Sequence, residues 1–126
     1  MPDQKIDAVI RVLDDLLNED DILATMVKSR GAPAVSPPTS RFKIKNFAIW
    51  QLINASVDQS LALVDAFSNA GADKLYLEIA EYEIIFFVID RGTVLVAVIP
   101  ALANKGLLEV EIENARRVLR QLFRRG

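Results

Sequence analysis

Carboxylates and cationic side chains are the main groups in this sequence that offer acid–base or ligand chemistry, because it contains no histidine and no cysteine. Without imidazole and thiolate groups, most catalytic triads and most zinc or iron sites are excluded. Acidic runs at 14–15 and 19–21 offer oxygen ligands for a hard cation, but such runs are more typical of a solvated helix face and turn. No GxxxxGK[ST] phosphate loop occurs, so the chain is not itself a P-loop GTPase. We therefore predict a protein that is not an enzyme and has no catalytic residue, metal site or cofactor.

Positive charge is concentrated in two places, although the whole chain has a net charge of −2. The segment 28–45 carries five cations and no acid, and a second basic group lies near the C-terminus at Arg116, Arg117, Arg120, Arg124 and Arg125. Stacking aromatic residues are not interleaved with these arginines, which also suit the negative end of a helix. We predict no nucleic-acid binding. The segment 28–45 is either a solvated loop or a surface that recognises an acidic protein.

Hydrophobic periodicity predicts the elements that must position these charges. Helical spacing predicts helices over about 4–18, 45–69 and 107–124, and alternating or continuous apolar runs predict strands within 21–30 and at 34–36, 74–82, 84–90 and 93–99. Prolines at 33, 37 and 38 flank the second strand and favour a position at a sheet edge. The predicted fold is one α/β domain over residues 1–126, with the order helix, two strands, helix, three strands, helix.

Charged residues interrupt the apolar hairpin EIIFFVIDRGTVLVAVIP, residues 83–100. Its uncharged runs are too short for a membrane helix, which needs about 20 apolar residues. Both faces of its two strands are apolar, so helices must cover the sheet on both sides. Five strands span about 20 Å, whereas one helix is only about 10–12 Å wide. Three helices are one too few, and a second copy of the chain would supply the fourth. We predict a homodimer with no membrane span, and the acidic N-terminal sequence indicates a cytoplasmic protein.

The predicted middle helix has an apolar arc that covers about half of its circumference, which is wider than a simple amphipathic stripe. Beside this arc, Ala48, Ala55 and Ala62 recur at heptad spacing and offer a close approach to another helix, although alanine is also simply a good helix former. Trp50 is assigned to the core or to the same seam. The polar side of the helix carries Gln51, Asn54, Asp58 and Asp65.

The element order and the stretch SVDQSLALVDAFSNAGADKLYLEIAEYEIIFFVIDRGTVLVAVIPALANKGLLEVEIENARRVLRQL resemble the Roadblock (dynein light chain) family. The resemblance runs from about Ile6 to Leu122, and the Asp90-Arg91-Gly92 turn and the glycine at 106 before the last helix carry it most clearly. The first hairpin, SRGAPAVSPPTS, departs from the family pattern because it is rich in proline.

The resemblance implies a five-stranded, mainly antiparallel sheet of order 2-1-5-4-3, Roadblock/profilin-like, with helices on both faces. It implies dimers in which the third strands join and the middle helices lie antiparallel, which assigns Ala48, Trp50, Ala55, Ala62, Tyr76, Leu77 and Glu78 to the dimer interface. A proline at Leu77 is then expected to abolish the dimer. Gln51, Asn54, Asp58 and Asp65 would form the partner-binding ridge.

Proteins of this family commonly serve as non-catalytic platforms for Ras-like small GTPases, or as subunits of motor and signalling complexes. The resemblance therefore implies a dimeric platform that regulates or scaffolds a small GTPase. A small-molecule-sensing protein or a structural subunit of a larger complex is the alternative function.

Overall fold

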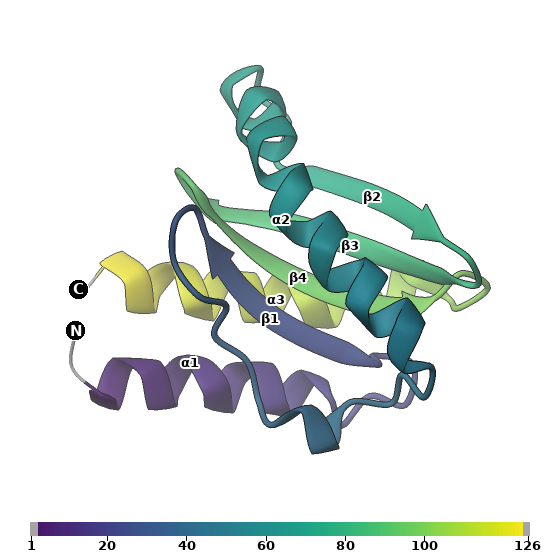
Figure 1. The fold of residues 1–126 in the computed structure, drawn as a ribbon. Coiled ribbons are helices and arrows are strands. Elements are labelled where there is room, and N and C mark those ends of the chain that lie inside the picture. The colour runs from purple at the N-terminus through teal and green to yellow at the C-terminus, as the bar shows by residue number, and fades with distance from the viewer. Residues whose placement is uncertain (1–2, 125–126) are drawn as a thin grey trace.

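One antiparallel sheet separates two layers of helices in the computed structural model, which describes residues 3–124 (Figure 1). Helices α1 and α3 lie side by side on one face, and α2 crosses the other face diagonally. The elements in chain order are α1 (Asp3–Leu16), β1 (Ala24–Ser29), the short 3-10 helix η1 (Thr39–Arg41), α2 (Phe47–Asn69), β2 (Lys74–Ile79), β3 (Tyr82–Asp90), β4 (Thr93–Pro100) and α3 (Lys105–Arg124).

The sheet has four strands in the order β1-β4-β3-β2, so the predicted five-stranded sheet is wrong in its strand count. The predicted second strand is reduced to one isolated bridge, in which Val35 pairs with Val27 of β1. Pro33, Pro37 and Pro38 surround this bridge, and because proline has no backbone N–H the pairing cannot extend. The other four strands keep the neighbours that the resemblance implied.

The continuous apolar pattern of β3 and β4 results from their position at the centre of the sheet. They pair with each other from Tyr82↔Pro100 to Asp90↔Thr93, and almost all of their residues are buried. A tight turn joins them, where Gly92 has a φ of +81°, a value that glycine adopts without strain. The prediction that helices cover both faces is confirmed for these two strands.

The alternation of side chains along the strands divides the core into two clusters. One cluster lies between the sheet and the pair α1 and α3, and includes Phe87, Leu95 and Ile112. The other lies between the sheet and α2, and includes Phe86, Val96 and Ile53. No helix within residues 3–124 is long and apolar enough to cross a bilayer.

Candidate functional site

Helix α2 is the element on which the predicted interaction residues depend, and its sequence fixes where it begins. The side chain of Asn46 caps the helix by accepting hydrogen bonds from the backbone N–H groups of Ala48 and Ile49, at 3.0 and 3.2 Å. Gly71 follows its C-terminal end with a φ of +95°. Between these ends α2 buries one stripe against the sheet, formed by Ile53, Val57, Leu61 and Val64.

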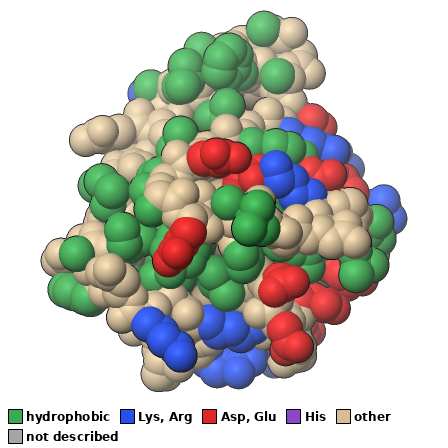
Figure 2. Space-filling view, turned by 90° about the vertical axis from the view of Figure 1, so that its right-hand side faces the viewer, with side chains coloured by type: hydrophobic (Ala, Val, Ile, Leu, Met, Phe, Trp, Pro, Cys, Tyr) green, Lys and Arg blue, Asp and Glu red, His purple; other side chains and the backbone are tan. Residues whose placement is uncertain are grey.

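The apolar arc of α2 is wider than the stripe that the sheet buries. Leu52 and Leu63 are each 50% exposed and Phe67 is 43% exposed. Ala48, Ala55 and Ala62 are also exposed, as their predicted role in an interface requires. Figure 2 shows apolar side chains gathered at the top of this view, where Figure 1 places the C-terminal end of α2. We call Leu52, Leu63 and Phe67 the apolar flank of α2.

Strand β2 extends this apolar surface from the helix to the edge of the sheet. Its residues alternate between half-buried and exposed, and the half-buried set, Leu75, Leu77 and Ile79, packs against the cluster beneath α2. The charged partners of α2 are Lys28 of β1 and Arg30 just after that strand, at the opposite side of the sheet, so the apolar flank is turned toward β2. The α2 face of the sheet is therefore only partly covered beside β2.

The outer edge of β2 has backbone groups available for pairing. A two-residue turn closes the β2–β3 hairpin at the pair Ile79↔Tyr82, and the N–H of Val88 bonds to the carbonyl of Asp73, 2.9 Å away. Alternate antiparallel pairs are hydrogen-bonded, so the backbone groups of Leu77 point to β3 and those of Tyr76 and Glu78 point outward.

The expectation that a proline at Leu77 abolishes the dimer is corrected by this direction of the backbone groups. A proline there would remove a hydrogen bond to β3, within the chain, rather than one at the free edge. The side chain of Leu77 contributes to the apolar surface, and Tyr76 and Glu78 carry the outward backbone groups.

A charged cluster covers the other face of β2. The Nζ atom of Lys105 lies 2.7 Å from the Oε2 atom of the buried Glu83, and the Tyr76 hydroxyl donates a hydrogen bond to the Glu109 carboxylate. The hydrogen bond to Glu83 raises the pKa of Lys105. Partial burial, followed by the hydrogen bond to Glu109, raises the pKa of Tyr76 from 10.0 to about 12. The hydrogen bond to Glu109 joins Tyr76 of β2 to α3 on this face of the sheet.

The predicted partner-binding residues lie on the flank of α2 opposite the apolar flank. Gln51 and Asp58 are exposed, and Asn54 and Asp65 are half-buried. The two carboxylates were predicted on a solvated side of the helix, but both form ion pairs: Asp58 with Lys28, 3.4 Å away, and Asp65 with Arg30, 2.9 Å away. The ridge is therefore bordered by cations of the β1 end.

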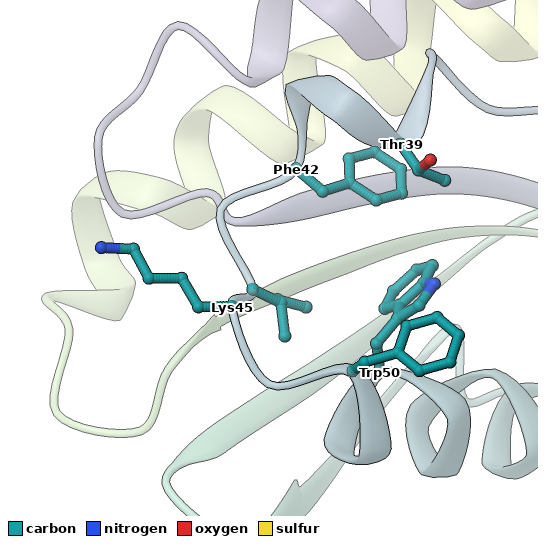
Figure 3. Close-up of a pocket in the computed structure, with 6 residues that line it drawn as sticks. Thr39, Phe42, Lys45 and Trp50 are labelled. Carbon is teal, nitrogen blue, oxygen red and sulfur yellow. The ribbon is translucent and has the colours of Figure 1, made fainter.

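Trp50 was assigned to the core or to the alanine seam, and it is half-buried against the cluster beneath α2. Its indole packs edge to face against Phe42, with ring centroids 5.1 Å apart, next to the segment that holds η1 (Figure 3). Trp50 therefore belongs to the side of α2 that faces the loop 30–46, and not to the side that faces β2.

Comparison with known proteins adds information on the fold. No protein-family model matches the sequence, and no curated protein matches it. Among solved structures, MglB of Myxococcus xanthus has a TM-score of 0.70 at 17% identity and covers 98% of this chain and 93% of its own. MglC of the same organism has a TM-score of 0.66 at 13% identity, over 88% and 95%. A Roadblock/LC7 domain from Streptomyces avermitilis has a TM-score of 0.62 at 13% identity, over 90% and 96%.

The chain has the Roadblock/LC7 fold. The expectation drawn from the sequence resemblance is confirmed at this level, and the departure that it noted, the proline-rich first hairpin, is the part in which the sheet loses its fifth strand. A further structure of this fold is described as MglB with a tetrameric arrangement, at 14% identity and a TM-score of 0.62.

Several cations of the two basic groups have partners among the described residues. Arg41 lies 2.8 Å from Asp14, and the Nζ atom of Lys43 donates to the carbonyl groups of Leu17 and Glu19, at 2.7 and 2.8 Å. In the C-terminal basic group, Arg116 is buried and forms ion pairs with Asp73 and Glu113, and Arg120 donates to two carbonyl groups of β3. Arg125 lies outside the described residues. Within residues 3–124 no group of carboxylates is arranged to hold a metal ion.

The apolar arc of α2 is as wide as its sequence predicts, but the sequence pattern does not single out the residues that remain exposed. Leu52, Leu63 and Phe67 belong to the predicted apolar arc, and the signal that could have separated them is the width of the arc itself, since one sheet face buries only part of it. Phe47 was missed because it opens the helix, where a 3.6-residue pattern has no preceding turn to define a face.

Proposed function

We propose that this chain is a non-catalytic homodimeric platform that binds a Ras-like small GTPase and regulates or scaffolds it. The Roadblock/LC7 fold supports this proposal together with the sequence resemblance, which implies such a role. The observation that carries it is the half-covered face of the sheet: the apolar flank of α2 is half-exposed and lies beside the unpaired edge of β2. A second copy covers both features at once.

In the proposed dimer the two α2 helices lie antiparallel and the two β2 strands join into one continuous sheet. Burying an apolar side chain contributes about 1.5–3 kcal/mol, and each Leu63 and Phe67 has roughly half of its surface left to bury. The outward backbone groups of Tyr76 and Glu78 would gain hydrogen bonds across the joined edge. Ala48, Ala55 and Ala62 allow the helices to approach closely.

The partner-binding surface is then the ridge formed by the polar flanks of both helices. Gln51, Asn54, Asp58 and Asp65 occupy it, and Asp58 and Asp65 are paired there with Lys28 and Arg30. Such a ridge of alternating sign is suited to a polar partner surface that presents both charges.

The test has two parts that fail separately. Sedimentation equilibrium over a wide concentration range measures whether the chain is a dimer, and a strictly monomeric chain at high concentration would refute the platform. Binding of the purified dimer to Ras-like GTPases, beginning with any that is encoded beside its gene, is then measured with GTP-analogue and GDP forms. Affinity that depends on the nucleotide supports the proposal, and the double variant Asp58→Lys with Gln51→Glu should abolish it without dissociating the dimer. A dimer that binds none of them in either form leaves the GTPase role without support.

A further inference from the structure

A cavity of about 280 Å³ opens between η1 and the first turn of α2, on the side of the helix that faces away from β2. Its walls are aromatic and aliphatic, and Figure 3 shows Phe42 and Thr39 on one side with Trp50 opposite them. Phe47 lines the same cavity and is 70% exposed, although a phenyl ring in water costs free energy. The proposed dimer does not use this surface.

The volume of the cavity indicates what fits into it. Sites for whole small molecules have volumes of about 300–1,000 Å³, and this cavity lies just below that range while remaining open to solvent. It is large enough for one bulky side chain. Aromatic-lined pockets that receive a single anchor side chain are typical hot spots of protein–protein interfaces.

The cations of the basic segment 28–45 differ in whether they already have a partner among the described residues. Lys28, Arg30 and Arg41 form ion pairs, and Lys43 is bound by backbone carbonyls. Lys45 remains, and no described carboxylate lies within ion-pair distance of it. Figure 3 shows its side chain leaving the edge of the cavity and extending away from Phe42 and Trp50. The ammonium group of Lys45 is thus placed to bind an anion that lies outside the cavity. It is not placed to bind an anion attached directly to an aromatic group inside the cavity.

We infer that this cavity is a docking site for a short acidic peptide segment of a partner protein, which inserts an aromatic side chain between Phe42, Phe47 and Trp50 and places a neighbouring Asp or Glu against Lys45. The position of the ammonium group favours a peptide over a small aromatic acid, because in a peptide the carboxylate belongs to a residue that flanks the anchor.

The chain carries its own probe for this inference, because Trp50 is its only tryptophan. Titration with the capped peptide Gly-Ser-Asp-Phe-Glu-Ser-Gly should give a saturable change in Trp50 fluorescence. The same peptide with alanine in place of phenylalanine should produce no saturable change, and the version with Asn and Gln in place of the acids should bind two- to fivefold more weakly, as expected for about 0.4–1 kcal/mol from an exposed ion pair.

Two variants test the walls and the charge separately. Phe47→Ala should weaken binding about tenfold or more, since the ring is a large part of the wall, and Lys45→Gln should remove the difference between the acidic and neutral peptides. Matched controls are Leu102→Ala, which shortens a side chain that is 99% exposed elsewhere, and Arg91→Gln, at the far end of the sheet. Neither control should change peptide binding.

The outcomes that overturn the inference are distinct from failure of the dimer. No saturable response up to millimolar peptide, equal binding of the neutral peptide, or equal binding of phenylacetate would each refute an acidic peptide site. Saturable binding of a single-stranded oligonucleotide that Lys45→Gln weakens would assign the site to nucleic acid instead. A variant that dissociates the proposed dimer, Leu63→Asp, should retain peptide binding, so that the two proposals stand or fall independently.

Discussion

The two faces of the sheet receive different amounts of cover, although the strands between them are equally apolar. Helices α1 and α3 pack side by side on one face and bury Ile112 and Leu119 completely. On the other face α2 lies alone and leaves Leu63 half-exposed. Four strands about 4.8 Å apart span about 14 Å between the outer axes, before side chains are added, and one helix of about 10–12 Å cannot shield that width. The covered face stabilises the fold, and the partly covered face is available for association.

The largest difference should appear when the same kind of truncation is made on each face. Ile112→Ala, on the covered face, should lower the free energy of unfolding by about 2–5 kcal/mol, because it leaves a cavity in a packed core. Leu63→Ala, on the partly covered face, should lower it by about 1 kcal/mol or less in dilute protein. Urea denaturation at low concentration measures both values. Equal losses would show that the two faces are packed alike.

A charge on the apolar flank should act on association and leave folding unchanged. Leu63→Asp should raise the dissociation constant of the dimer about 30-fold or more, which corresponds to the 2 kcal/mol or more expected of a residue at the centre of an interface. Sedimentation equilibrium measures the constant, and Leu102→Asp provides the control at a fully exposed position. An unchanged constant in Leu63→Asp would place the interface elsewhere.

The edge of β2 should show a smaller effect, which depends on the direction of the backbone. Glu78→Pro removes an outward N–H and should weaken the dimer by about 1–3 kcal/mol, from one lost hydrogen bond of about 0.5–1.5 kcal/mol in each copy. Leu77→Pro removes an inward N–H and should destabilise the monomer. Circular dichroism and sedimentation distinguish the two. If Glu78→Pro dimerises normally, the β2 edges do not join.

The smallest effect should come from the charged cluster on the far side of β2. Because the pKa of Tyr76 is raised to about 12 in the folded chain, the stabilising contribution of the neutral phenol is complete below its ordinary value of 10.0 and is lost as pH rises toward 12. The Tyr82→Phe variant keeps Tyr76 as its only tyrosine. Its absorbance titration should therefore show a single phase of phenol ionisation, at a pH above the ordinary tyrosine value. Glu109→Gln should move that phase to lower pH, and an unshifted phase would exclude the hydrogen bond as a cause.

The sequence predicted the strands at the centre of the sheet more accurately than the strand at 34–36, at its edge. The hairpin of β3 and β4 was predicted within two residues of its observed bounds, because its strands are apolar on both sides and Asp90-Arg91-Gly92 marks the turn. The strand at 34–36 was overpredicted. Val35 has the right type of side chain, but the surrounding prolines remove the N–H groups that a strand needs.

The candidate site was predicted in part. Helical periodicity predicted the alanine seam and the polar ridge of α2: Ala48, Ala55 and Ala62 are exposed, whereas two of the four ridge residues are half-buried, and the roles of both sets stay predictions. The ion pairs of Asp58 and Asp65 and the packing of Trp50 on Phe42 were not predicted, because each joins α2 to residues outside that helix. No pattern within one element reports such contacts.

The sequence by itself determined the order of the helices and of the four strands that form the sheet, the need to cover both faces of the central hairpin, and the shortage of helices, since these follow from local periodicity and from the widths of strands and helices. Only the tertiary structure decided which flank of α2 is turned toward β2, which backbone groups of β2 point outward, and which cation of the basic segment 28–45 has no ion-pair partner among residues 3–124. Those properties depend on how elements pack against one another, and packing is determined by contacts between residues that are distant in sequence.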